Sequence, residues 1–318
     1  MQEHDIANLE DNLRRALAIK AEDLLHTLGG DEGAKIYEAF LGIPYNRALL
    51  STLLMKQPDL ATIDLDRFRI AEQVRALHEM LETLSLGLRP WQQSPDAETI
   101  QHEALYPLEG FLSALPSMAR GIWDTSSVRD GPLRSFFDDC AAWANLVEAI
   151  ERAFEDEGDL YIIRVADLAR LSGVELRTMR NRVGPMKPIR TAPQRSLKYQ
   201  ELRGSSFVGV NTLDALVWLS GRQKVVTSII DPSWVETVLE EARDPRTIGR
   251  APIVLALINE DPLPEIAERL GWSEQKLKLW AERGPNNNAD DAKALAHLAD
   301  LCPDTYAAKC AAVATPNA

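Results

Sequence analysis

Cysteine is scarce in this sequence. The 318 residues include three cysteines, Cys140, Cys302 and Cys310, and none of them belongs to a Cys-x-x-Cys pair. Disulfide-dependent domains and zinc modules need more cysteines at closer spacing. The cysteine content therefore excludes a disulfide framework and gives no sign of a zinc site. We expect three free thiols in the protein core.

Long apolar stretches are also missing. No segment approaches the roughly 20 apolar residues that a helix needs to cross a bilayer. The first residues, MQEHDIANLED, are too acidic and too polar for a secretory signal. We therefore expect a cytoplasmic protein with no membrane partner.

The motifs of common enzyme classes are absent as well. Residues 29–35 contain glycines and a lysine, but not at the spacing of a phosphate-binding loop. His78-Glu79 lacks the second histidine of a zinc-protease helix, and no Gly-x-Ser-x-Gly sequence occurs. The remaining histidines are far apart in the sequence: His4, His26, His102 and His297. We expect a protein that is not an enzyme and uses neither a cofactor nor a metal.

Positive charge is scarce everywhere except in one segment. The whole chain has a net charge of −13, but residues 163–225 hold 12 basic and 4 acidic side chains, a net charge of +8. Residues 1–162 carry −15 and residues 226–318 carry −6. Such a local reversal is typical of a surface that binds nucleic acid. The alternative is a basic face that docks on the acidic part of the same chain.

Apolar residues at helical spacing predict three long helices. They cover residues 9–28, 70–84 and 136–154, and an acidic run at 155–159 ends the third. The spacing in 70–84 is that of a paired helix over two heptads, which fits either a dimer seam or packing within one domain. Four prolines between residues 88 and 131 predict loops and short helices there.

Residues 164–183 have the pattern of two short helices that cross at a steep angle. The first helix needs a small residue where the backbones approach, and the turn needs one that accepts positive φ; Ala169 and Gly173 fit these positions. The apolar residues that close the small core are Leu168, Leu171, Val174 and Met179.

The second of these helices leaves a basic face outward. Arg177, Arg180 and Asn181 share that face, and Thr178 lies beside it. Arginine can donate two hydrogen bonds to guanine, and asparagine can pair in the same way with adenine. We expect Arg170 and Arg182 to contact phosphate. An ordinary helical hairpin is the alternative, but it does not explain the arginines.

The order of the elements that follow is also informative. A basic, irregular stretch precedes the β-prone residues 206–210, and a short Leu-Trp-Leu helix begins near Asn211. The basic side chains of that stretch are Lys187, Arg190, Arg195, Lys198 and Arg203. Together, residues 163–225 resemble the winged helix-turn-helix of MerR-type regulators and phage excisionases.

The resemblance implies a division of roles. The recognition helix of that family enters the major groove, which would place Arg177, Arg180 and Asn181 on bases. The wing contacts the backbone or the minor groove, which would place Lys198 and Arg203 there. The stretch from Gly184 to Phe207 is longer than a compact wing requires, and in this the sequence departs from the family pattern.

A second helix-turn-helix pattern occupies residues 263–280. Ala267 and Gly271 repeat the four-residue spacing, and Leu277 falls where Met179 fell. Residues 265–284 carry four basic and four acidic side chains, so this pattern fits protein docking as well as DNA contact. The candidate contacts are Ser273, Gln275, Lys276 and Lys278.

We therefore expect a mainly α, multi-domain protein with a central winged helix-turn-helix and a small β-wing. The expected parts are an acidic helical domain (1–158) for dimerisation, sensing or partner binding, the basic domain (159–228), and a C-terminal helical domain (229–318). The leading hypothesis is a dimeric, sequence-specific regulator of transcription that binds double-stranded DNA. The rivals are an architectural or adaptor factor (excisionase-like, partition or replication accessory) and a protein-interaction module without DNA.

Overall fold

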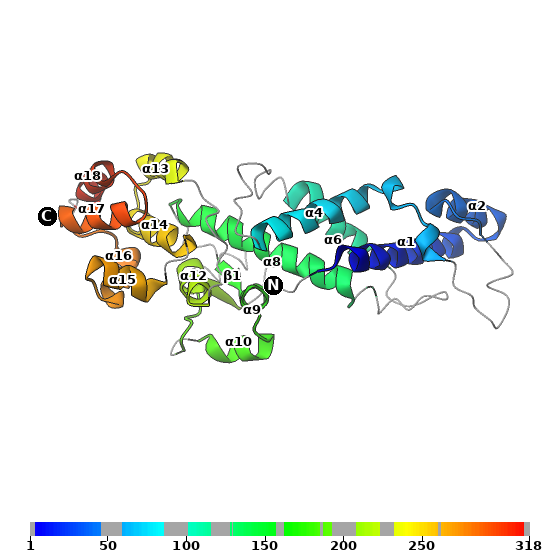
Figure 1. The fold of residues 1–318 in the computed structure, drawn as a ribbon, viewed down its shortest axis with the longest axis horizontal. Helices are drawn as coiled ribbons and strands as arrows, with labels where there is room; N and C mark the ends of the chain where they lie inside the picture. The colour runs from blue at the N-terminus through cyan, green and yellow to red at the C-terminus, as the bar shows by residue number, and fades with distance from the viewer. Residues whose placement is uncertain are drawn as a thin grey trace. The chain divides into compact units, whose positions relative to one another are not determined.

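The computed structural model shows a mainly helical protein (Figure 1). The residues that it describes are 4–45, 59–85, 101–115, 128, 130–156, 162–184, 187–192, 208–222, 232–259 and 262–314. They fall into two compact units. The N-terminal unit is built from residues 4–82 and 101–141, and the C-terminal unit from residues 83–85 and from residue 142 onward. The division after residue 141 falls within a continuous helix, Pro132–Ala153.

The N-terminal unit consists of helices. They are α1 (Ile6–Leu28), α2 (Gly30–Leu41), the 3₁₀ turns η1 (Leu60–Thr62) and η2 (Leu65–Arg67), α4 (Arg69–Ser85), the π-helical turn η4 (Gln101–Leu105), α6 (Tyr106–Ser113) and the first part of α8 (Pro132–Ala153). Asp5 caps α1 by accepting a hydrogen bond from the N–H of Ala7. The helices predicted over 9–28, 70–84 and 136–154 are confirmed, each within a few residues of its expected ends.

Two histidines meet in the interior of the N-terminal unit. The Nε2 of His4 lies 2.9 Å from an oxygen of the buried Asp139. The Nε2 of His78 lies 2.7 Å from the carbonyl oxygen of His4. Phe136 packs edge-on against His4, with ring centres 5.3 Å apart. Sequence patterns do not predict this contact, because 74 residues separate the two histidines.

The C-terminal unit is built around one buried helix. Its elements are the second part of α8, β1 (Ile162–Arg164), α9 (Val165–Ser172), α10 (Leu176–Arg182), β2 (Gly209–Asn211), α12 (Thr212–Ser220), α13 (Pro232–Glu241), α14 (Pro245–Ile258), α15 (Leu263–Leu270), α16 (Glu274–Arg283), α17 (Ala289–Leu298) and α18 (Pro303–Ala314). Every residue of α14 from Thr247 to Ile258 is buried. Helices α12, α13, α16, α17 and α18 all contact it. A helix that is apolar around its whole circumference belongs in such a central position.

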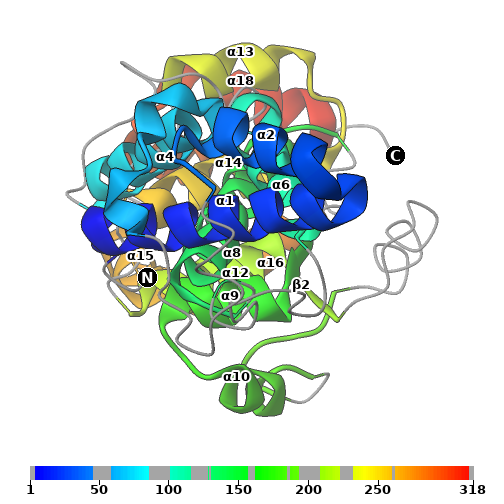
Figure 2. The ribbon, with the colours of Figure 1, turned by 90° about the vertical axis from the view of Figure 1, so that its right-hand side faces the viewer.

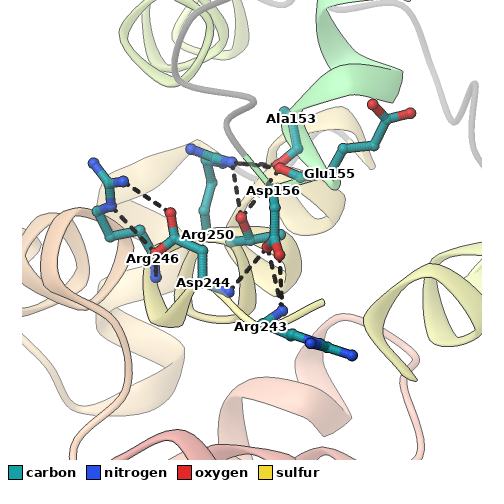
Figure 3. A network of polar contacts seen from close by, with 8 residues as sticks. Ala153, Glu155, Asp156, Arg243, Asp244, Arg246 and Arg250 are labelled. Atoms are coloured by element: carbon teal, nitrogen blue, oxygen red, sulfur yellow. Dashed lines mark hydrogen bonds and ion pairs between the residues drawn. The ribbon is translucent and has the colours of Figure 1, made fainter. Parts of the chain in front are cut away.

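The buried helix α14 carries a charged side chain that needs partners. Arg250 is 7% exposed, and its Nε donates a hydrogen bond of 2.8 Å to the carbonyl oxygen of Ala153, the last residue of α8 (Figure 3). The side chain of Asp156 accepts hydrogen bonds from the N–H groups of Arg243 and Asp244 just before α14. Carbonyls at the end of a helix lack partners within it, so Arg250 satisfies one that would otherwise be buried and unpaired.

The cysteines differ in their surroundings. Cys140 and Cys310 are buried, as expected for core thiols, whereas Cys302 is exposed, so the expectation is wrong at that position. Cys302 lies directly before α18, where the hydroxyl of Thr305 donates to its sulfur at 3.2 Å. In the described parts of the chain, none of the helices has the length and apolar character needed to cross a membrane.

Replacing Arg250 by methionine should destabilise the C-terminal unit by about 1–3 kcal/mol, because the carbonyl of Ala153 would stay buried without a donor. Arg246 is the matched control on the same helix: it is only half-buried, and its ion pair with Asp244 is 2.8 Å long. Arg246→Met should cost less than about 1 kcal/mol. Urea unfolding followed by circular dichroism compares the two variants. Equal losses of stability would contradict the role given to Arg250.

Cys302 should be alkylated first by iodoacetamide at mildly alkaline pH. Hydrogen bonds from the side chain and the backbone N–H of Thr305 lower the pKa of its thiol. Burial raises the pKa of Cys140 well above its usual range and that of Cys310 to about 11. Since the thiolate is the reactive form, mass spectrometry of the native protein should find the label at Cys302. Early label at Cys140 or Cys310 would contradict this order.

Candidate nucleic-acid interface

Helices α9 and α10 are joined by a three-residue turn. Gly173 begins the turn in the left-handed conformation, with φ 64° and ψ 27°. The N–H of Val174 then donates to the carbonyl oxygen of Ala169 at 2.9 Å. This arrangement ends a helix without strain only where the residue tolerates positive φ, which is the reason that the sequence places glycine here.

One side chain anchors α10. Met179 is fully buried, and it is the only buried residue of this helix. On the α9 side, Leu168 and Ala169 are buried, as the sequence pattern predicted. Met179 is therefore the one residue that packs α10 against the core, and the other residues of the helix are exposed to solvent.

Helix α9 is fixed in turn by a buried carboxylate. Asp167 is 4% exposed and accepts hydrogen bonds from the Nε of Arg164 at 2.7 Å and from the side-chain amide of Asn145 at 3.0 Å. Asn145 lies on α8, so the contact ties α9 to the long helix. A buried carboxylate is stable only with such partners.

The predicted base-reading residues all lie on the exposed face of α10. In the views of both Figures 1 and 2, α10 lies at the periphery of the C-terminal unit. Arg170, expected on phosphate, is half-buried near the end of α9. The exposed side chains of α10 include Arg177, Thr178, Arg180, Asn181 and Arg182.

Three extended segments lie beside these helices. Strand β2 pairs antiparallel with β1, with Val210 opposite Ile163. On its other side, Val210 forms an antiparallel bridge with Thr191, and the N–H of Ala192 donates to the carbonyl of Gly209 at 2.9 Å. Residues 187–192 and 208–211 are therefore adjacent extended segments. The candidate contacts Arg195, Lys198 and Arg203 fall in residues 193–207, outside the described residues.

Arg190 is held by two carboxylates of the same chain. Its guanidinium lies 3.1 Å from Asp214 on α12 and 2.7 Å from Glu282 on α16. The hydrogen bond with Asp214 is the main reason that the pKa of Arg190 is raised. A phosphate would have to compete with both carboxylates, so this geometry gives Arg190 a structural contact. Lys187, the other candidate described in this segment, is exposed.

Helices α15 and α16 repeat the geometry of α9 and α10. Gly271 has φ 65° and ψ 28°, within one degree of Gly173 in both angles. The N–H of Trp272 donates to the carbonyl of Ala267 at 2.8 Å, as Val174 does to Ala169. Leu277 is fully buried at the position of Met179. The two sequence patterns therefore fold into the same local structure.

The second pair differs in what its polar groups contact. The hydroxyl of Ser273 caps α16 by accepting from the N–H of Lys276 at 3.1 Å. The Nζ of Lys276 lies 2.7 Å from Asp291 and 3.8 Å from the ring centre of Trp272. Lys278 is half-buried, and Gln275 is exposed. Two of the four candidate contacts in this pair are thus engaged inside the chain.

Sequence reasoning missed a cluster at the end of α10. The guanidinium carbons of Arg182 and Arg222 lie 5.3 Å and 4.0 Å from the ring centre of Trp218 on α12. Both arginines are exposed, and the tryptophan is half-buried. The sequence places Arg222 close after Trp218, which is a local signal for one of these contacts. Only the packing of α12 beside α9 brings Arg182 to the same ring.

The described residues contain no group of three histidine, cysteine, aspartate or glutamate side chains that could hold a metal ion. The polar groups that this surface offers are guanidinium, amide and hydroxyl groups, which are donors of hydrogen bonds. Such a surface is suited to binding anionic or carbonyl-bearing ligands.

Arg190→Gln should raise the pKa of Asp214 further. Burial raises this pKa above its usual value, and the hydrogen bond with Arg190 opposes that effect. Without Arg190, the carboxyl should stay protonated to higher pH, and the folded state should gain relative stability as pH falls through that pKa. Carboxyl-detected NMR titration measures the change. Lys187→Gln is the control; an equal shift there would show that the contact between Arg190 and Asp214 is not the cause.

Comparison with known proteins adds no family to this picture: no protein-family model, no curated protein and no solved structure was found to match the chain.

Proposed function

We propose that this protein is a cytoplasmic, sequence-specific DNA-binding protein that regulates transcription. Residues 159–228 form a winged helix-turn-helix in this proposal, and α10 is its recognition helix. The observation that carries the proposal is the exposure of α10 to solvent. Five of its polar side chains are exposed, and only Met179 is buried.

The exposed face has the chemistry of a base reader. Arg177, Arg180 and Asn181 are three and four residues apart, so they project from the same side of α10. The major groove is wide enough to admit a helix, and its guanine and adenine edges accept the hydrogen bonds that these side chains donate. Arg182, at the end of α10, contacts a phosphate in this proposal.

The distribution of charge supports the same function. Residues 163–225 carry a net charge of +8 within a chain of −13. The basic segment attracts the phosphate backbone, and the acidic remainder repels DNA that is not held by specific contacts. Discrimination between sequences improves as non-specific affinity falls.

The second helix pair has a supporting role in this proposal. Glu282 on α16 holds Arg190, and Lys276 is occupied by Asp291. In this proposal the pair α15–α16 fixes the base of the wing. One short helix contacts only a few base pairs, so we propose that two copies of the chain bind neighbouring half-sites as a homodimer.

Mobility shifts at several salt concentrations test the proposed function. One preferred duplex with a steep salt dependence is expected of a regulator. Bending of the DNA, or cooperative binding at many sequences, would favour an architectural factor. No binding at about 50 mM salt would reject DNA binding and favour a protein-interaction module.

Arg177→Ala should relax the preference at one base position and cost about 1–3 kcal/mol in binding of the preferred duplex. Lys187→Ala should weaken all duplexes alike, because a phosphate contact carries no sequence information. Selection from a randomised duplex library, followed by titration, measures both effects. Arg15→Ala, on an exposed face of α1, is the control for loss of one positive charge. Identical behaviour of the Arg177 and Lys187 variants would contradict the division of roles.

A further inference from the structure

Two positive charges converge on one aromatic ring at the end of α10. The guanidinium carbons of Arg182 and Arg222 both lie within 5.3 Å of the ring centre of Trp218. No carboxylate among the residues that the structure describes pairs with either guanidinium. Arg182 ends α10 and Arg222 follows α12, so the cluster joins two elements of the proposed DNA-binding domain.

Two other cations of this unit, Lys276 and Arg190, have an anion close by. Lys276 also lies over a tryptophan, Trp272, and its Nζ is 2.7 Å from Asp291. Arg190 is held by Asp214 and Glu282. The cluster at Trp218 has the cations and the ring but lacks the anion within the described residues. An exposed cation–π contact is a weak attraction, and two like charges at one ring repel each other, so a bound anion would stabilise this arrangement.

The geometry favours a phosphate group as that anion. A guanidinium is planar and can donate two parallel hydrogen bonds to a phosphate. Contact with the ring restricts both guanidinium groups before a ligand arrives, which lowers the entropy cost of binding. The base-reading residues lie on the same helix as Arg182, so the backbone phosphates of a duplex that occupied α10 would pass nearby.

We propose that Arg182 and Arg222, held on Trp218, form a phosphate clamp. That the phosphate belongs to the DNA backbone rests on the function proposed above, whereas the clamp itself rests on the cluster. Neither Trp218 nor Arg222 belongs to the set of contacts inferred from the sequence. The clamp positions α10 in the groove and carries no base preference.

The first test measures binding of the full-length protein to a random-sequence duplex over a range of salt concentrations. Arg222→Gln should lower affinity about tenfold and reduce the slope of log K against log salt by about one unit, because one phosphate contact is lost. Arg15→Gln removes the same charge from α1 and should leave the slope unchanged. An Arg222→Gln slope equal to that of the wild type would overturn the clamp.

Variants of the tryptophan separate the ring from the charges. The Nε1 of Trp218 is buried and has no acceptor among the described residues. Trp218→Phe therefore removes no hydrogen bond of these residues and keeps an aromatic face. Trp218→Phe should bind like the wild type. Trp218→Leu leaves both charges but removes the platform, and it should lower affinity several-fold with little change in slope. Circular dichroism checks that each variant is folded. If folded Trp218→Leu binds as tightly as Trp218→Phe, the ring has no role in binding.

The second test uses inorganic phosphate in place of DNA. The protein contains seven tryptophans, and in 5-fluorotryptophan-labelled protein the ¹⁹F signal of Trp218 is the one missing from Trp218→Phe. Phosphate should shift this signal more than chloride does at equal ionic strength, and Arg222→Gln should abolish the difference.

The two tests distinguish the clamp from the proposed function. If duplex binding and the Arg177 effect are seen but Arg222→Gln changes neither the slope nor the phosphate response, the clamp is wrong and the DNA-binding function stands. If phosphate shifts the Trp218 signal through Arg222 but no duplex binds, the clamp is a site for a free phosphate and the DNA-binding function is wrong. If the wild type shows neither duplex binding nor a phosphate-dependent shift of the Trp218 signal, both the clamp and the DNA-binding function are wrong.

Discussion

A guanidinium group lies in the interior of the C-terminal unit, where Arg250 on the buried helix α14 donates to the carbonyl of Ala153 at the end of α8. Burial of a charge is costly unless it is paired and hydrogen-bonded, so this contact constrains where α8 can end relative to α14. Asp156 adds bonds to the N–H groups that precede α14. Since α12 and α16 pack on α14, the whole unit depends on this junction.

The candidate interface is reached from that junction by a short series of contacts. Asn145 on α8 binds Asp167 on α9, and α9 carries α10 through the small core around Met179. Helix α12 contacts both α9 and α14. A rigid scaffold of this kind can hold a recognition helix in one orientation while leaving nearly all of its side chains to a ligand.

Charge pairing divides the cations of this unit into two kinds. Arg164, Arg190 and Lys276 have carboxylate partners within 3.1 Å, and they hold elements together. The arginines displayed by α10 are exposed instead, and they carry the proposed function. The repeated helix pair illustrates the difference, because α9–α10 and α15–α16 share their turn geometry but not the contacts of their basic residues.

The sequence by itself determined the three long helices, the two helix pairs with their glycine turns and the outward face of α10, because helical periodicity and a residue that tolerates positive φ are local signals. It also located the basic segment, since charge can be counted without a structure. Only the tertiary structure decided what each cation contacts. Arg190 contacts Glu282 across 92 residues, and Arg182 and Arg222 each lie over the ring of Trp218, through packing that no local pattern encodes.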